Sequence, residues 1–327
     1  MYQIDFSTPV HVYFIGIGGI SMSGLAEILL EKHFKVSGSD ARQSALTDML
    51  SDRGAHIYLG QRKENITADI DVVVYTSAIH PDNPEFIAMQ ELSIPSLTRA
   101  ELLGEIMRNY ELPVAISGTH GKTTTTSMVS EILLQADTDP TLSIGGILKS
   151  IGGNIRVGHS PYFVTEACEY TNSFLSFFPK IGIILNIEED HLDFFKDIHD
   201  IRSSFRRFAA LLPADGTLII NRTIPDVEEI YEGLPCRVIT FGGKDADYSV
   251  FRIHYDDKGC AEFELQSTGK PPCTFKLSVP GEHNIYNALA AIALADLFAI
   301  PRKDMGSQLF SNGAPGYRIQ LMSNKNS

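Results

Sequence analysis

The sequence predicts an α/β protein of two domains, each built on a sheet of mostly parallel strands. Short apolar runs typical of buried strands alternate with helical stretches along much of the chain. Two of these runs end in a glycine-rich turn that leads directly into a helix. The chain has 327 residues, which is more than one hydrophobic core usually holds, so two domains are expected.

The amino-terminal domain begins with a strand, a turn, a helix and a second strand. Residues 11–15 form the first strand, a glycine cluster follows at 16–19, residues 25–30 have helical apolar spacing, and 34–38 form the next strand. This order predicts a Rossmann-like unit, in which the helix after the first strand directs its N-terminus at a phosphate-bearing ligand.

The residues of this turn do not identify its ligand. Gly16 and Gly18 fit the first two positions of a dinucleotide-binding turn, but Ser21 stands where a third glycine is expected. Asp40 follows the second strand, as in a Rossmann-type layout. A plain strand-to-helix turn, an NAD-dependent dehydrogenase and a site for another anion, such as a UDP pyrophosphate, all agree with this pattern.

A second glycine-rich run, residues 117–126, follows the apolar strand 113–116. Gly118 and Gly121 would let backbone N–H groups converge on a phosphate, the Lys122 ammonium would neutralise the outer phosphates, and a hydroxyl after it would reach Mg²⁺. The strict Walker pattern asks for a glycine where an isoleucine stands, so a threonine-rich loop capping an ordinary helix is the alternative. The order of strand, loop, Lys-Thr pair and helix favours a nucleoside triphosphate site.

In the rest of the second domain, the predicted strands change from parallel to partly antiparallel along the chain. Runs at 162–165, 181–185 and 217–220 look like parallel strands, whereas 237–278 contains short, partly antiparallel strands. Residues 281–287 open a long apolar helix. The second domain is therefore predicted as a P-loop-type ATPase domain with a mostly parallel sheet and a small antiparallel one.

Domain boundaries follow from these patterns. We place the Rossmann-like domain at 1–110 and the P-loop-type domain at 111–311. Residues 312–327 form an atypical tail that is polar at its end, and we expect this tail to be disordered.

Composition excludes some classes of partner. The formal net charge is −13, with 40 acidic residues against 27 lysines and arginines, which disfavours a nucleic-acid partner. The longest apolar stretch, 288–300, contains Asp296 and is too short to span a bilayer, so no membrane insertion is expected. No signal peptide is visible, and the four widely spaced cysteines suggest no disulfide framework, which fits a cytoplasmic protein.

Acidic and imidazole side chains follow two predicted strands of the second domain. Glu166 and Glu169 come after the strand at 162–165, and the acidic segment 186–193, with His191, follows the strand at 181–185. Strand ends meet ligands in open α/β sheets, and Mg²⁺ prefers oxygen ligands, so Glu166 and His191 are candidates to hold a magnesium ion. The alternative for Glu169, Glu188 and Glu189 is a solvated acidic loop.

Together the motifs resemble those of the Mur ligases, the ATP-dependent amide-forming family of peptidoglycan synthesis. They are spread over residues 10–300 in the order that the family has. The resemblance is greatest to the alanine-adding branch, since His120 stands in the phosphate loop and Met-Ser-Gly at 22–24. The segments that carry it are 16–24, 98–103, 118–125, 166–170, 186–193 and 283–291.

The resemblance implies a role for each matching position. Lys122, Glu166 and His191 would be catalytic, and Thr123, Glu166 and His191 would bind Mg²⁺. UDP-N-acetylmuramate would contact Gly16, Gly18, Gly19, Asp40, Ser77 and Arg99. ATP would contact Gly118, Thr119, His120, Gly121, Lys122, Thr123, Thr124 and Asn284, the last at the adenine.

The implied reaction has two steps. The muramyl carboxylate attacks the γ-phosphate of ATP to give an acyl phosphate and ADP, and the amine of L-alanine then attacks the acyl phosphate. Metal and lysine charges would stabilise the transfer. Several sister ligases carry a carbamylated lysine near the place of Phe205, and the alanine-adding branch generally lacks it, as this sequence does.

The resemblance also implies a third domain that closes over the site and opens with an Arg-Arg-Phe-Glu-type hinge. No such hinge is recognisable after residue 311. We therefore expect the C-terminal ligase domain to be absent, and the 327-residue chain to bind the UDP-sugar while forming little product. A catalytically inactive fragment that binds UDP-sugar and ATP, and a relative of the murein-peptide recycling ligase, are the alternatives.

Overall fold

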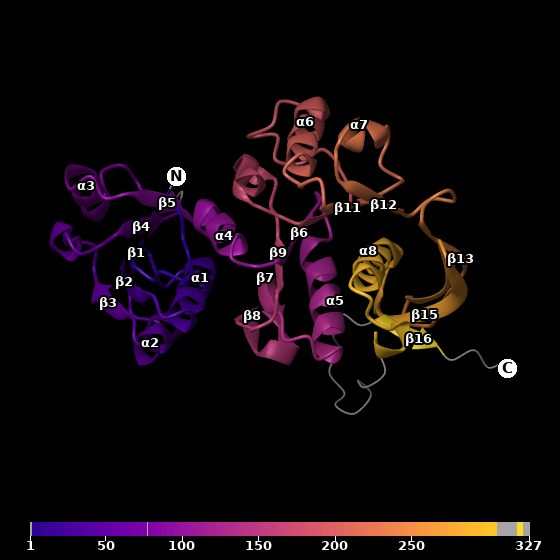
Figure 1. Cartoon of the computed structure of the whole chain (residues 1–327), viewed down its shortest axis with the longest axis horizontal. Coiled ribbons are helices and arrows are strands. Elements are labelled where there is room, and N and C mark those ends of the chain that lie inside the picture. The colour runs from indigo at the N-terminus through magenta and orange to yellow at the C-terminus, as the bar shows by residue number, and fades with distance from the viewer. Residues whose placement is uncertain (1, 77, 306–318, 323–327) are drawn as a thin grey trace. The chain divides into compact units, whose positions relative to one another are not determined.

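The computed structural model describes residues 2–76, 78–305 and, as backbone only, 319–322. The chain divides into two compact units, residues 1–109 and 110–327, which Figure 1 shows in different parts of the colour range. Ser77, a predicted substrate contact, lies outside the described residues.

The amino-terminal unit is a parallel sheet with helices beside it, as predicted. Its strands are β1 (His11–Ile15), β2 (Lys35–Asp40), β3 (His56–Leu59), β4 (Val72–Tyr75) and β5 (Ser96–Thr98). Its helices are α1 (Ile20–Glu31), α2 (Ala45–Asp52), the 3₁₀ turn η1 (Lys63–Asn65), α3 (Pro84–Glu91) and α4 (Arg99–Met107).

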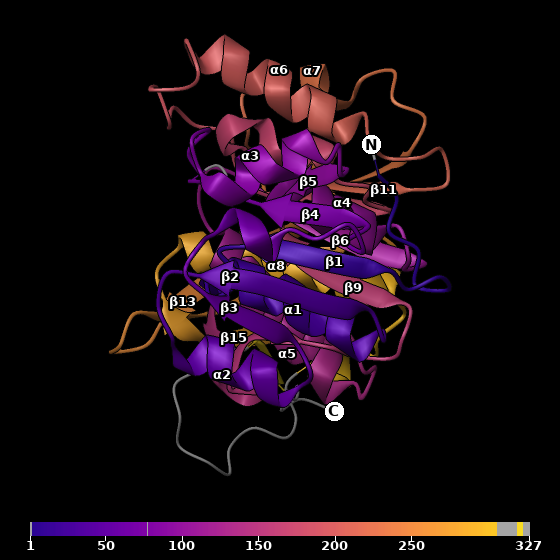
Figure 2. The ribbon, with the colours of Figure 1, turned by 90° about the vertical axis from the view of Figure 1, so that its left-hand side faces the viewer.

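The five strands pair in parallel in the order β3-β2-β1-β4-β5. Figure 2 shows β3, β2, β1 and β4 side by side. Because all strands run the same way, their carboxyl ends share one edge of the sheet. Gly16, Asp40 and Arg99 stand at the carboxyl ends of β1, β2 and β5, so they lie along this edge.

The second unit has a longer sheet. Its strands are β6 (Leu112–Ser117), β7 (Thr141–Leu148), β8 (Gly153–Arg156), β9 (Tyr162–Glu166), β10 (Ile181–Ile184), β11 (Thr217–Asn221), β12 (Arg237–Phe241), β13 (Tyr248–Tyr255), β14 (Cys260–Ser267), β15 (Lys270–Pro280) and β16 (Ile319–Met322). Its helices are α5 (Lys122–Gln135), α6 (Ile198–Ala209), α7 (Glu228–Tyr231) and α8 (His283–Leu297), with 3₁₀ turns η2 (Lys149–Ile151), η3 (Tyr170–Ser176) and η4 (Arg302–Asp304).

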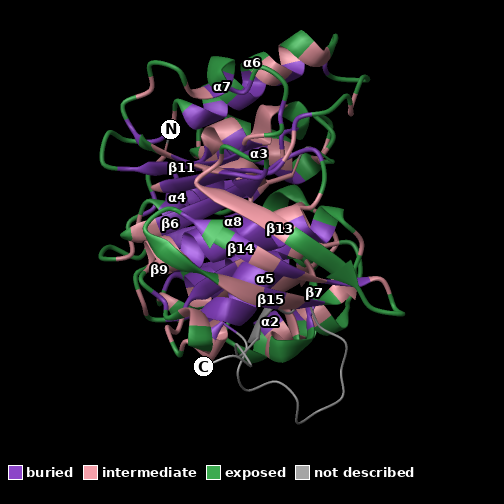
Figure 3. Cartoon of the chain, turned by 90° about the vertical axis from the view of Figure 1, so that its right-hand side faces the viewer, coloured by how far each residue is buried: buried purple, intermediate pink, exposed green. Residues whose placement is uncertain are grey.

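This sheet is parallel in its centre and antiparallel at both ends. The parallel part runs β12-β11-β10-β6-β9-β7. Strand β8 is antiparallel to β7, and β13 to β16 form an antiparallel ribbon. The two parts join at one residue pair, Phe241 and Tyr248, so the small antiparallel sheet is a continuation of the parallel one. Strand β13 is half-buried to exposed along its length, as Figure 3 shows.

The structure differs from the sequence analysis in two places. The sequence patterns did not identify β7 and β8, because residues 141–156 mix glycine, serine and apolar residues without a clear period. The expected disorder of the tail 312–327 is wrong for residues 319–322, which form β16 and pair with β15.

Helix α8 organises the core of the second unit. It packs against α5 and against strands of both parts of the sheet, β11, β12, β13 and β15. Residues 288–295 are all buried, which explains why the segment is apolar on every face. Among the described residues, no helix combines the length and hydrophobicity that crossing a bilayer requires.

Candidate nucleotide and catalytic site

The phosphate loop between β6 and α5 requires glycine at two positions. Gly118 has φ +145°, and a Cβ atom there would lie 2.9 Å from the Cβ of Leu185. Gly121 has φ +85°, and a Cβ atom there would lie 2.6 Å from the side-chain oxygen of Asn287 in α8. The loop therefore passes tightly between the end of β10 and the start of α8, and only glycine fits.

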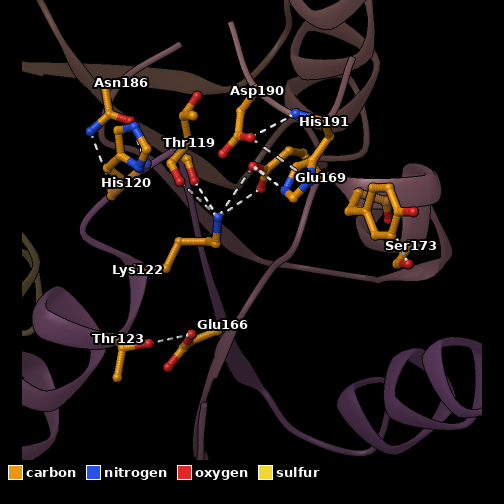
Figure 4. Close-up of polar contacts among 12 residues, drawn as sticks. Thr119, His120, Lys122, Thr123, Glu166, Glu169, Ser173, Asn186, Asp190 and His191 are labelled. Atoms are coloured by element: carbon orange, nitrogen blue, oxygen red, sulfur yellow. Dashed lines mark hydrogen bonds and ion pairs between the residues drawn. The ribbon is translucent and has the colours of Figure 1, made fainter. Parts of the chain in front are cut away.

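Polar contacts fasten this loop to the segment after β10. The backbone N–H of His120 donates to Asn186 Oδ1 at 2.8 Å, and Asn186 Nδ2 returns a bond to the His120 carbonyl at 3.0 Å. The Thr119 hydroxyl accepts from the Glu188 N–H at 2.9 Å. Figure 4 shows Asn186 beside His120. The side chain of Thr119 is thus used to hold the loop, whereas the His120 ring is exposed.

Helix α5 directs an uncapped N-terminus at the loop. Its N-cap is Gly121, which offers no side-chain acceptor, and its first turn contains no acidic residue. The N–H groups of Lys122, Thr123 and Thr124 therefore have no capping side chain, and the helix dipole adds partial positive charge. This is the arrangement of an anion site, so the glycine cradle fits the phosphates of ATP.

Lys122 lies at the centre of the site, as Figure 4 shows. Its ammonium donates to the carbonyls of Gly118 at 2.6 Å and Thr119 at 3.2 Å, and it binds both carboxylate oxygens of Glu169 at 2.9 and 3.2 Å. The Glu169 side chain is only 2% exposed. Glu169 is therefore part of the site and not a solvated loop residue.

Glu166, at the end of β9, is paired with Thr123. The Thr123 hydroxyl donates to Glu166 Oε2 at 2.9 Å, and the N–H of Gly145 in β7 donates to Oε1 at 2.5 Å. Burial raises the pKa of Glu166, and these two bonds offset only part of that effect. A Cβ atom on Gly145 would lie 2.7 Å from Glu166, so β7 forms a wall of the site.

His191 lies next to Glu169, with 3.9 Å between its Nε2 and Glu169 Oε1. Its backbone is left-handed, with φ 52°. The ring of Tyr170 packs on the imidazole at a centroid distance of 4.5 Å, and the Tyr170 hydroxyl donates to Asp193 at 2.8 Å. These contacts fix the predicted metal ligand in place.

Of the three residues predicted to bind Mg²⁺, the structure brings Thr123 and Glu166 together but shows no contact of His191 with either. Thr123 and Glu166 are hydrogen-bonded, whereas the side-chain contacts of His191 are with Glu169, Asp190 and Tyr170. Within the described ranges no three His, Cys, Asp or Glu side chains are grouped as metal ligands. A hydroxyl and a carboxylate suit Mg²⁺ that keeps waters and phosphate oxygens as its other ligands, so the donor set fits.

Asn284 has a different environment from the one expected of an adenine contact. It is buried in the first turn of α8, where its Nδ2 donates to the Pro280 carbonyl at 2.7 Å and its Oδ1 accepts from Asn287 at 3.0 Å. Asn287, which the sequence reasoning missed, touches the phosphate loop at Gly121. The two asparagines join the start of α8 to the loop.

The glycine turn of the amino-terminal unit also precedes an uncapped helix. Gly16 has φ +82°, and the N-cap of α1 is Gly19 without a side-chain bond. The Gly18 N–H donates to Asp40 Oδ2 at 2.9 Å, so Asp40 shapes the turn directly. Arg99 is the first residue of α4, after a capping box made by Thr98 and Glu101.

Comparison with known proteins agrees with both units. Residues 11–111 match the Mur ligase family catalytic domain, and residues 116–295 match the Mur ligase middle domain. A UDP-N-acetylmuramate–L-alanine ligase of Agathobacter rectalis is 58% identical over 98% of this chain and 70% of its own length. One of Lachnospira eligens is 62% identical over 90% of this chain and 64% of its own length.

A solved structure has the same fold. The ligase MPL of Neisseria meningitides, named for UDP-N-acetylmuramate and L-alanyl-γ-D-glutamyl-meso-diaminopimelate, superposes with a TM-score of 0.77 at 28% identity. The likeness covers 88% of this chain and 94% of that one. The family match at residues 11–111 removes the basis for a dehydrogenase. With a constrained phosphate loop, a Thr–Glu pair beside it and matches over both units, the chain belongs to the Mur ligase family.

Proposed function

We propose that this protein joins L-alanine to the carboxylate of UDP-N-acetylmuramate in a reaction driven by ATP. The observation that carries the proposal is the glycine loop that presents Lys122 at the uncapped start of α5, with Glu166 and Thr123 beside it. The relatives that are 58% and 62% identical are named for this reaction. The chain spans about two thirds of their length, 70% and 64%, so the activity of the whole protein is part of the proposal.

The chemistry follows from charge. The muramyl carboxylate attacks the γ-phosphorus, ADP leaves, and the amine of L-alanine attacks the resulting acyl carbon and releases phosphate. The Lys122 ammonium and the N–H groups of α5 would bind the phosphates and stabilise the charge that develops on them. A magnesium ion held by Thr123, Glu166 and His191 would neutralise phosphate charge.

The remaining residues would position the substrates. In the first unit the turn at Gly16, Gly18 and Gly19, together with Asp40, Ser77 and Arg99, would bind the UDP-sugar. We keep Asn284 in the ATP site, but its amide is bonded within the protein. It would therefore act by holding α8 against the phosphate loop through Asn287.

Calorimetric titration tests both halves of this proposal. The 327-residue chain should bind UDP-N-acetylmuramate and, separately, ATP in the presence of Mg²⁺. NADH should not compete with the UDP-sugar. A chain that binds neither ATP nor the UDP-sugar would contradict the proposal, and displacement of the UDP-sugar by NADH would reassign the first unit.

A murein-peptide recycling ligase is the second candidate, since the neighbour of TM-score 0.77 is named for a tripeptide substrate. The two candidates differ in the amine that they accept. ADP release stimulated by L-alanine supports the first, and release stimulated by L-alanyl-γ-D-glutamyl-meso-diaminopimelate with no effect of L-alanine supports the second. The products differ in mass and would be separated by mass spectrometry.

A further inference from the structure

We propose that Glu169 is a positioning residue that competes with the nucleotide phosphates for the Lys122 ammonium. It would thereby weaken the binding of ATP by the protein. This inference rests on the proposed binding of ATP at the phosphate loop. It assigns to Glu169 a role that the phosphate-loop motif does not contain.

The hydrogen bonds of Lys122 are the first argument. An ammonium group has three N–H donors. In the structure it faces four acceptor atoms, the carbonyls of Gly118 and Thr119 and the two oxygens of Glu169, at 2.6 to 3.2 Å. A phosphate oxygen can therefore approach Lys122 closely only if one of these acceptors withdraws.

Charge and attachment decide which acceptor withdraws. The two carbonyls belong to the loop backbone, which is fastened through Gly118 against Leu185 and through Thr119 to the segment after β10. The Glu169 carboxylate is at the end of a side chain and carries the same sign as a phosphate. Exchange would thus replace one anion by another beside the same ammonium.

Burial makes this competition effective. The side chains of Lys122 and Glu169 are 17% and 2% exposed, so their attraction is less screened than that of a surface pair. Separating them leaves the Glu169 charge buried next to the phosphates, which is unfavourable. The His191 Nε2 atom also lies near this carboxylate, at 3.9 Å from Glu169 Oε1.

The backbone around Glu169 holds the carboxylate in this position. Thr171 and Asn172, two and three residues after Glu169, both have left-handed backbones, with φ 54° and 57°. The neighbouring Tyr170 is fixed by its contacts with His191 and Asp193. Strained conformations of this kind persist where surrounding contacts enforce them, so the carboxylate is preorganised on Lys122.

The test compares ATP affinity in four variants of the 327-residue chain. Glu169→Gln keeps the shape of the side chain and removes its charge. Glu189→Gln removes a charge from an exposed position in the acidic segment and is the matched control. Lys122→Ala, alone and with Glu169→Gln, removes the group for which the competition is proposed.

We expect Glu169→Gln to lower the dissociation constant for ATP roughly five- to tenfold, as loss of a competing charged hydrogen bond requires. Glu189→Gln should change it less than about twofold, since exposed charges are screened. AMP, which has no β- or γ-phosphate, should bind equally to wild type and Glu169→Gln. In the Lys122→Ala background the effect of Glu169→Gln should fall to that of the control.

Weaker or unchanged ATP binding by Glu169→Gln would overturn the inference and would indicate that Glu169 orients Lys122 for the phosphates. An equal gain in ATP affinity with Glu189→Gln would show that any loss of negative charge near the site strengthens binding, and this result would also overturn the inference. Failure of the wild-type chain to bind ATP would instead contradict the proposed function. A cooperative thermal unfolding transition in each variant shows that the second unit, which contains the substitutions, is folded.

Discussion

Two carboxylates of the second unit, the buried side chain of Asp296 and the half-buried Glu166, have opposite surroundings. Asp296, near the end of α8, accepts hydrogen bonds from Lys270 at 2.7 Å, from Arg302 at 2.5 and 3.2 Å and from Tyr248 at 3.1 Å. Burial alone would raise the pKa of Asp296, but the bonds from Arg302 and Lys270 outweigh it and hold the pKa below its ordinary value. Glu166, beside the phosphate loop, has a pKa that burial raises.

The different surroundings of the two carboxylates indicate that Asp296 stabilises the fold, whereas Glu166 is available for function. Lys270 and Arg302 satisfy the charge of Asp296. Through Lys270 and the Tyr248 hydroxyl, this carboxylate connects α8 to β15 and β13. Among the described residues, Glu166 accepts hydrogen bonds from a hydroxyl and a backbone N–H, both uncharged. A carboxylate whose charge is not neutralised by a neighbouring cation is suited to bind a cation that arrives with a substrate. In the absence of ligand, the burial of this charge destabilises the folded state.

The largest expected effect is at Asp296. Asp296→Asn removes the charge that compensates Arg302 and Lys270, and should lower the free energy of unfolding by about 3–5 kcal/mol, as measured by urea denaturation. The control is Glu264→Gln, whose partner Arg252 is largely exposed, with an expected loss below about 1 kcal/mol. Similar losses in the two variants would refute the contrast.

Lys122→Ala should reduce the stabilisation of the chain by ATP. A ligand at a hundred times its dissociation constant stabilises by about 2.7 kcal/mol, which thermal denaturation detects readily. The ligand-free variant should also melt lower, because Glu169 loses its cation. Lys258→Ala, in the exposed turn after β13, should retain the ATP effect, and both variants should be stabilised by UDP-N-acetylmuramate. A full ATP response in Lys122→Ala would speak against the phosphate loop.

Gly118→Ala tests the geometry of the loop. The added methyl group meets Leu185 in a conformation that favours glycine, and should cost about 2–3 kcal/mol of stability and weaken ATP binding. Gly152→Ala is the control, because Gly152 also has positive φ (+67°) but nothing within 4 Å of the added atom. Its cost should be about 1 kcal/mol, with normal ATP binding. Equal losses of stability in the two variants would show that backbone strain alone, without the close approach to Leu185, explains the effect of Gly118→Ala.

Glu166→Gln should stabilise the ligand-free chain by about 1 kcal/mol near pH 7 and abolish Mg²⁺-dependent ATP turnover. Since the folded state raises the pKa of Glu166, stability from this group falls as pH rises through the window above its unfolded pKa. The stabilisation by Glu166→Gln should therefore disappear at pH values below the unfolded pKa of Glu166. Asp296 has the opposite sign, because its pKa is lowered. Its contribution is present above its unfolded pKa and is lost as pH falls from that value through the lower folded pKa. Denaturation curves of the two variants at several pH values would show whether these profiles diverge.

Local patterns were enough to predict the parallel sheets and the phosphate loop. Buried strands such as residues 181–184 consist of apolar residues, and Gly118, Gly121 and Lys122 occur in an order with few other uses. Most of the predicted residues of the second unit lie together in one site. Glu169 was not assigned, because its burial depends on the turn that follows β9 and not on its neighbours in sequence.

Other features depend on contacts between distant segments. The pair Gly145-Gly146 inside a strand was a signal for close approach of another group, and Glu166 and Thr123 are those groups. Asn186 and Asn287 hold the loop from β10 and α8, across sequence separations that periodicity does not reveal. Phe205, at the place where some sister ligases carry a modified lysine, is fully buried against Phe174 and has a packing role here.

The contact between Tyr170 and His191 offers an optical reporter. The chain contains no tryptophan, so a Tyr170→Trp variant would have a single indole, located next to the imidazole and one residue from Glu169. Its emission would record changes in this corner of the site without an added label. Stopped-flow mixing with nucleotide would then follow, in real time, how fast the Lys122–Glu169 pair responds.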